Sequence, residues 1–282
     1  MRRRLPLKNK NRKLKQLLSG PYLFWMISFI IIPLIMIFYY GLTDTKKNFT
    51  LLNLAKITTP ENLKALGLAL LLAFISTLLC LLLAYPLSMI LRDFQMNQSS
   101  FIVLIFILPM WMNFLLRTLA WQNLLEKNGT INAILHFLHL PGLKIINTPY
   151  AIILGMVYNF LPFMVLPIYN VLSKIDKDVI AAARDLGANP VQTFLRIILP
   201  LSVPGIISGI TMVFVPALTT FVISDLLGGS KILLIGNVIE QEFKQGSNWN
   251  VGSGLSLVLM IFIIISMALI AKYDKDGEGN AF

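Results

Sequence analysis

Six long apolar segments, separated by shorter polar stretches, dominate the pattern of hydrophobic and polar residues along the chain. An α-helix needs about 20 apolar residues to cross the hydrocarbon core of a bilayer. The segments are of that length and cover Gly20–Gly41, Leu63–Leu91, Phe101–Leu125, Tyr150–Leu172, Leu201–Leu227 and Gly254–Tyr273. The pattern predicts an all-α, polytopic membrane protein with about six transmembrane helices.

A patterned polar stretch, VIAAARDLGANPVQTFLRIILP (Val179–Pro200), separates the fourth and fifth apolar segments. Its periodicity predicts a helix over Asp176–Leu186, after which Gly187 supplies the left-handed position that commonly ends a helix. Asn189 is a favoured N-cap and Pro190 a favoured first residue for a second helix. We therefore expect a helix–turn–helix, although a short loop would be enough to connect two spans.

Both helices of this expected hairpin are amphipathic. The first carries an apolar face made of Val179, Ile180, Ala183 and Leu186. The second carries an apolar stripe of Val191, Phe194, Leu195 and Ile198, with Gln192, Thr193 and Arg196 facing away. A hairpin that only packs against the membrane helices would show the same pattern, so periodicity leaves open whether the segment also binds a partner.

The composition agrees with a membrane location, because 56% of the residues are hydrophobic and only 13% are charged. Eight of the 24 basic residues fall within the first fifteen positions. A basic block ahead of an apolar span is typical of a cytoplasmic end that contacts anionic lipid. The net charge of +11 therefore indicates a bilayer partner and no nucleic acid. The first apolar segment is too long for a signal peptide, so we expect a retained helix.

Basic residues outside the spans predict the orientation of the chain. With the N-terminus in the cytoplasm, fifteen Lys and Arg residues lie on the cytoplasmic side and seven outside, which favours an N-in, C-in arrangement in the cell membrane. The expected division is a basic cytoplasmic N-terminus (1–19), a first helix with its external loop (20–62), a membrane core (63–273) and a cytoplasmic tail (274–282). The core contains the cytoplasmic loop 173–200.

The residues offer no recognisable catalytic or metal-binding arrangement. Gly228–Lys231 lacks the upstream glycine of a nucleotide-binding loop, and Cys80 stands alone in an apolar segment. His136 and His139 belong to a short helix, expected near Ile131–Leu138 on the outer membrane face, with no carboxylate or thiol close in sequence. We expect no metal, no cofactor and no enzymatic activity in this chain.

Arg117 is the exceptional ionisable residue within an expected span. Placing Arg at the centre of a membrane helix costs about 2.5–3.5 kcal/mol. Anchoring at the outer membrane face, or pairing with Asp225, is favoured over a gating role. The scarcity of other ionisable residues in the spans disfavours an ion-coupled carrier. In the last external loop, KILLIGNVIEQEF is expected to form an interfacial or re-entrant helix.

Several fixed spacings in the polar stretch resemble the EAA loop of type I ABC importer permeases, which share a MetI-like fold. The family consensus is Glu-Ala-Ala, three residues, Gly, nine residues, Ile, one residue and Leu-Pro. The matching residues are Ala182, Ala183, Gly187, Ile197, Leu199 and Pro200. Ala181 stands where the family has Glu; Asp178 and Asp185 are candidates to replace that contact, and Ala188 continues the loop.

In that family the loop docks onto a cytoplasmic ATPase. The resemblance therefore implies that residues 63–273 form an ABC permease core and that ATP is bound by a separate subunit. It also implies three kinds of partner: two ATPase subunits, a second permease subunit of the PotC type and an extracytoplasmic substrate-binding protein. The location implied is a bacterial cell membrane.

Three further stretches, LPMWMNFLLRTLAW, GMVYNFLPFMVLPIY and SDLLGGSKILLIGNVI, are similar to spermidine/putrescine permeases of the PotB type. This likeness implies polyamine import; permeases for iron, thiamine or sulfate are the alternative, and a secondary carrier is less favoured. A polycation pathway needs carboxylates and aromatic faces. The candidate pathway residues are Asp225, Glu240, Phe221, Trp111, Trp121, Tyr158 and Arg117. For Asp225, a substrate contact and an ion pair with Arg117 remain equally open.

Overall fold

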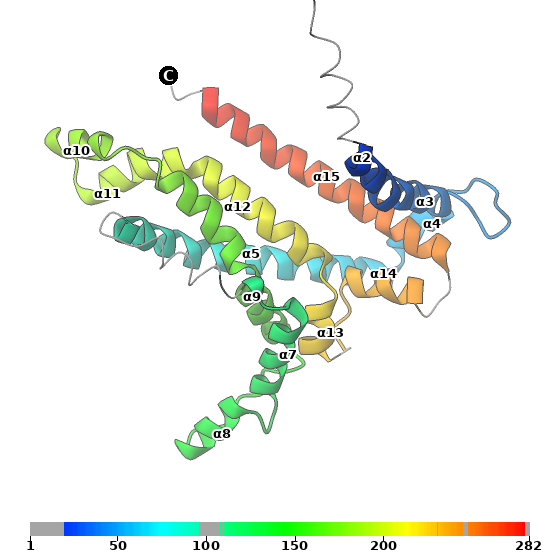
Figure 1. The fold of residues 1–282 in the computed structure, drawn as a ribbon. Helices are drawn as coiled ribbons and strands as arrows, with labels where there is room; N and C mark the ends of the chain where they lie inside the picture. The colour runs from blue at the N-terminus through cyan, green and yellow to red at the C-terminus, as the bar shows by residue number, and fades with distance from the viewer. Residues whose placement is uncertain (1–19, 96–107, 109, 230, 245–247, 280–282) are drawn as a thin grey trace, which may run out of the picture. The chain divides into compact units, whose positions relative to one another are not determined.

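The computed structural model describes residues 20–95, 108, 110–229, 231–244 and 248–279, which are almost entirely helical (Figure 1). Five helices within these ranges are long and apolar enough to cross a membrane. The chain divides into two compact units. One combines residues up to Ile57 with Glu242–Leu259, and the other combines Thr58–Gln241 with residues from Met260 onward.

The first predicted span is confirmed at Gly20–Gly41. It consists of α2 (Gly20–Met26), a π-helical segment η1 (Ile27–Ile31) and α3 (Ile32–Gly41). The π segment lies just before Pro33, whose ring removes a backbone donor and crowds the carbonyl four residues earlier. In the most apolar stretch of this span, no residue is buried within the chain, as expected for side chains that face lipid.

Two asparagines satisfy the carbonyl groups at the end of α3. Asn53, on α4 (Leu52–Ala55), donates hydrogen bonds to the Gly41 oxygen at 3.3 Å and the Thr43 oxygen at 2.8 Å. Asn250, on α15 (Trp249–Gly279), donates to the Tyr40 oxygen at 3.1 Å. These bonds replace the intrahelical partners that the last turn of a helix lacks.

Three helices form the centre of the second unit: α5 (Pro60–Gln95), α9 (Pro149–Leu172) and α12 (Leu199–Thr219), each in contact with the other two. The α5 and α9 helices confirm the second and fourth predicted spans. Gly205 brings α12 close to α9, because a Cβ atom there would lie 2.9 Å from the Pro167 carbonyl oxygen. Small residues at such crossings let membrane helices approach closely.

Two predicted spans are not continuous helices. The third, Phe101–Leu125, lies partly outside the described residues, and its described part breaks at Asn113, whose side chain accepts bonds from Leu115 N and Leu116 N to begin α7 (Phe114–Leu125). The fifth ends as α12 at Thr219. Thr220 is extended, and a separate helix, α13 (Val222–Gly228), follows.

The two predicted short helices are present, and their external position stays a prediction. The segment expected near Ile131–Leu138 forms α8 (Thr130–Phe137), and KILLIGNVIEQEF contains α14 (Ile235–Lys244). Asn132 ties α8 to its flanking loop by donating to the Leu143 oxygen at 3.1 Å and accepting from Leu143 N at 2.7 Å. The last predicted span begins earlier than expected, at Trp249.

We predict that Gly205→Val destabilises the second unit, because the added atoms meet the α9 backbone, which cannot move without separating the two helices. Overpacking of this kind costs about 1–3 kcal/mol. Gly67→Val is the matched control, since a Cβ atom at this helical glycine of α5 meets nothing within 4 Å. Thermal unfolding in detergent should show a lower midpoint for Gly205→Val than for Gly67→Val; equal midpoints would contradict the close α9–α12 contact.

Candidate functional site

The predicted cytoplasmic hairpin is present. Its first helix is α10 (Lys177–Asp185), capped by Asp176, whose side chain accepts a bond from Asp178 N at 3.0 Å. Gly187 follows with φ of +85°, the left-handed region that favours glycine. Ala188 N then donates to the Ala183 oxygen at 3.0 Å, which closes the helix end.

The second helix of the hairpin starts with a complete capping box. The Asn189 side chain accepts from Gln192 N at 2.8 Å, and the Gln192 side chain accepts from Asn189 N at 3.0 Å. From Pro190, α11 (Pro190–Thr193) continues through the π-helical η3 (Phe194–Ile198) into α12. The second helix of the hairpin therefore belongs to one helical run of 30 residues, Pro190–Thr219. As at Pro33, the π segment lies just before a proline, here Pro200.

The expected apolar faces of the hairpin are only partly buried. Ala183 and Ile198 are buried, but so is Thr193, which we expected to face away; its hydroxyl donates to the Asn189 oxygen and is therefore satisfied. Four apolar side chains of the hairpin are exposed, by 45% for Val179, 89% for Leu186, 63% for Val191 and 53% for Leu195. We call these four residues the exposed hairpin surface. Their exposure shows that only part of each apolar face packs against the rest of the chain.

The residues that match or flank the EAA-loop consensus differ in their exposure. Asp178, Ala182, Asp185, Gly187 and Pro200 are exposed, Ala188, Ile197 and Leu199 are partly buried, and Ala183 is buried. The hairpin thus presents acidic, apolar and small side chains together on its free surface. Such a surface on an ordered hairpin suits docking of another protein better than packing within one chain.

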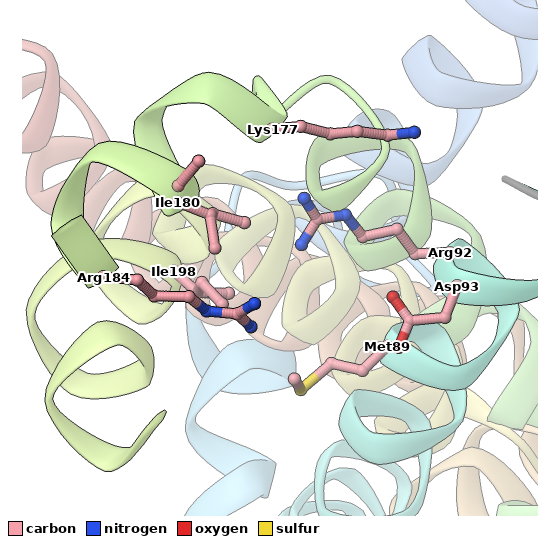
Figure 2. A pocket seen from close by; sticks show the side chains of 8 residues that line it. Met89, Arg92, Asp93, Lys177, Ile180, Arg184 and Ile198 are labelled. Carbon is pink, nitrogen blue, oxygen red and sulfur yellow. The ribbon is translucent and has the colours of Figure 1, made fainter. Parts of the chain in front are cut away.

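A cavity of about 390 Å³ lies between α10, η3 and the end of α5 (Figure 2). Its lining residues are Met89, Arg92, Asp93, Lys177, Ile180, Ala181, Arg184 and Ile198. Arg92 is 9% exposed and donates from Nη2 to the Ile175 oxygen at 3.3 Å, so it also holds the start of the hairpin. Ala181, the position that departs from the family consensus, lies in the cavity wall.

A second polar region surrounds the break between α12 and α13. Asn237, 1% exposed, donates from Nδ2 to the Asp225 carboxylate at 2.6 Å and to the Phe221 oxygen at 3.1 Å. Its Oδ1 accepts from Ser224 Oγ at 2.6 Å and from Leu234 N at 3.0 Å. One amide therefore holds the start of α13, fixes one oxygen of Asp225 and joins both to α14.

Arg117 is buried on α7, with 7% of its surface exposed. Its Nε and Nη1 atoms make no hydrogen bond within the described part of the chain. The neighbouring Thr118 accepts a bond from Asn159 of α9 at 3.4 Å. The α7 helix packs against both α9 and α13, which carries Asp225. The pairing of Arg117 with Asp225 stays a prediction.

The other candidate pathway residues, four aromatic side chains and Glu240, lie in different parts of the second unit. Trp121 of α7 and Tyr158 of α9 form an edge-to-face pair with ring centroids 5.3 Å apart, and Phe221 caps the start of α13. Trp111 lies before the break at Asn113 and is 76% exposed, and Glu240 lies on α14, partly buried. The second unit thus places Phe221 directly before α13, which carries Asp225, and brings Trp121 and Tyr158 together at the α7–α9 contact.

Sequence reasoning missed the asparagines that organise this region. Asn159 is 1% exposed within α9, where it donates to the Gly155 oxygen at 2.9 Å. Asn237 was hidden in a segment assigned only as a short helix. A search for amide side chains within or beside apolar segments would have found both, because hydrocarbon offers such groups no water partner.

The membrane helices and the ordered hairpin between two of them are the features expected of a transport permease. The family of binding-protein-dependent transport system inner membrane components matches residues 7–275, and the chain belongs to this family. It is accordingly a multi-pass inner-membrane permease subunit of an ABC importer.

Relatives and solved structures agree with this assignment. The chain is 35% identical over 274 residues to the spermidine/putrescine transport system permease protein PotB of Haemophilus influenzae, covering 94% of this chain and 96% of the relative. It is 39% identical over 245 residues to PotB of Escherichia coli K12, covering 84% and 89%. A bacterial ABC transporter that imports the polysaccharide alginate has the same fold, with a TM-score of 0.73 at 16% identity over 97% of this chain and 98% of that one.

We predict that Asn237→Ala destabilises the α12–α13 junction, because it removes four hydrogen bonds and leaves buried polar groups unsatisfied. The expected loss is about 1–3 kcal/mol. Asn123→Ala, an exposed asparagine on α7, is the control. Hydrogen exchange of the α13 amides in detergent should accelerate only in Asn237→Ala; unchanged protection would show that Asn237 does not hold the junction.

Proposed function

We propose that this chain is the permease subunit of a polyamine importer that takes spermidine or putrescine from an extracytoplasmic binding protein. The observation that carries the proposal is the 35% identity with the Haemophilus PotB protein over nearly the full length of both chains. The partners in this proposal are a second permease subunit and two cytoplasmic ATPase subunits. ATP binds to the ATPase subunits, and this chain supplies part of the membrane pathway.

The polar region around α13 has chemistry that suits a polyamine. A flexible polycation is stabilised by carboxylates and by aromatic faces placed against its ammonium groups. Asn237 holds one oxygen of Asp225 in a fixed position, and Tyr158, 38% exposed, offers an aromatic surface held by Trp121. The positive charge of Arg117 repels a polycation unless a carboxylate neutralises it. We assign this neutralisation to an ion pair between Arg117 and Asp225.

The hairpin and the polar region lie at opposite ends of the same helical run. Pro190–Thr219 contains 30 residues, so a helix of this length spans about 45 Å. Its first residue follows Asn189 of the hairpin, and its last precedes the break before Phe221 and Asp225. We infer that ATPase closure moves the hairpin and that this helical run transmits the displacement to α13.

We predict that the assembled importer hydrolyses ATP faster with binding protein loaded with spermidine or putrescine than with binding protein loaded with iron or thiamine. Asp225→Asn should raise the spermidine concentration for half-maximal stimulation roughly tenfold, equivalent to about 1.4 kcal/mol. Glu126→Gln, an exposed acid of the α7–α8 loop, makes the same charge change and should leave it unaltered.

The outcomes of this assay separate the function from the site. Stimulation by iron or thiamine alone would overturn the polyamine assignment, as would uptake by this chain alone in an ion gradient. Normal spermidine stimulation in Asp225→Asn would leave the polyamine assignment standing and remove Asp225 from the pathway.

We predict that Gly187→Val uncouples ATP hydrolysis from uptake while membrane insertion stays normal. A Cβ atom at Gly187 meets nothing within 4 Å, so the effect arises from the left-handed backbone, which costs an L-residue about 1–2 kcal/mol. Gly187→Asn is the matched control, because Asn tolerates this conformation. Uptake per ATP should fall in the Val variant and persist in the Asn variant; normal uptake with Val would contradict the role of the hairpin.

A further inference from the structure

The cavity beneath α10 combines basic side chains from two separate parts of the second unit. Arg92 comes from the end of α5, and Lys177 and Arg184 come from α10, while Asp93 is the one carboxylate among the lining residues. Two positive charges therefore remain in excess. Within the residues that the structure describes, no ion pair joins Asp93 to these cations. Figure 2 shows Arg92 and Arg184 extending toward the same space from their two helices.

The cavity lies on the inner side of the hairpin, apart from the exposed hairpin surface. Lys177, Ala181 and Arg184 are spaced by four and three residues, so they share one face of α10. That face looks toward the end of α5 and Ile198 of η3, which is 8% exposed. Val179 and Leu186 of the exposed hairpin surface lie on the opposite side of α10.

The methyl group of Ala181 leaves room in the cavity wall. A longer acidic side chain at this position would bring a carboxylate toward Lys177 and Arg184, its neighbours on the same helical face. With alanine there, none of the α10 residues that line the cavity is acidic, and the excess positive charge among the lining residues stays available to an external ligand.

We propose that this cavity binds a phosphate group, either the headgroup of an anionic phospholipid or a free phosphate ion. Arg guanidinium groups match phosphate oxygens with paired, charge-assisted hydrogen bonds. The cavity lies at the cytoplasmic end of a membrane helix, where the anionic leaflet raises the local concentration of phosphate headgroups. Basic pockets between helices at this level are a known way of holding such headgroups.

The bound phosphate would connect the end of α5 to α10. Arg92 already links the end of α5 to the Ile175 carbonyl, and a phosphate shared with Arg184 would add a second, ligand-dependent link. The angle of the hairpin to the bundle would then depend on the ligand. The binding step itself requires no ATPase, so it can be tested apart from transport.

The test uses the full chain purified in detergent, with three probes: inorganic phosphate, phosphatidylglycerol and the zwitterionic phosphatidylcholine. Binding is measured as the concentration-dependent rise of the unfolding midpoint and, for the lipids, by native mass spectrometry. Ala181→Glu places a carboxylate in the cavity, and Arg184→Gln removes one cation. Arg196→Gln removes the same charge from η3 at an exposed residue outside the cavity lining and serves as the control.

We expect the affinity for the phosphate probe to fall at least tenfold in Ala181→Glu and Arg184→Gln and less than twofold in Arg196→Gln. Binding of inorganic phosphate identifies a free-ion site, and binding of phosphatidylglycerol alone identifies a lipid site; each supports the proposal when the two cavity variants weaken it. Equal affinity in the unmodified chain and the three variants would overturn the proposal. Failure of both anionic probes to bind would also overturn it, and would leave these cations as a contact for a carboxylate of the ATPase partner.

Discussion

A backbone group buried in hydrocarbon must find its hydrogen-bond partner within the protein, and this requirement governs where the helices of this chain can end. Asparagine side chains meet it repeatedly. Asn113 begins α7, Asn53 and Asn250 complete the end of α3, and Asn237 supports the start of α13. Each of these amides lies close to a point where a helix within or beside an apolar segment begins or ends. The same chemistry at Asn189 gives the cytoplasmic hairpin its second helix.

Proline and glycine determine the remaining geometry. In the part of the chain that the structure describes, the π-helical segments η1 and η3 lie just before Pro33 and Pro200, where a regular helix would place the ring against a carbonyl. Gly187 turns the chain between the hairpin helices with a positive φ, and Gly205 lets α12 approach α9. The second helix of the hairpin thereby continues without a loop into α12, which ends at Thr219, six residues before Asp225. The helical run Pro190–Thr219 therefore connects the hairpin to the break that precedes the polar region.

The long helices and the hairpin could be predicted because their signals are local: runs of apolar residues, Gly187, and the pair Asn189 and Pro190. The breaks at Asn113 and Thr220 could not, because the hydrophobic run continues across each of them. Whether α12 and α13 are separate helices depends on Asn237, more than fifteen residues beyond Thr220. Periodicity also could not tell which apolar face of the hairpin packs inward, since Thr193 is buried and Val191 and Leu195 are exposed.

The central claim is that the exposed hairpin surface is covered by the ATPase, and the chain offers a direct way to measure this. Cys80, the only cysteine, is buried, so a polar maleimide should label Leu186→Cys with little background. Tyr150→Cys is the control, because Tyr150 is also exposed and lies at the end of α9 that is farther along the chain from the hairpin. Addition of the ATPase subunits to the purified permease pair should slow labelling at position 186 at least tenfold and leave position 150 unchanged. Equal labelling of position 186 with and without bound ATPase would contradict the assignment of this hairpin as the coupling surface.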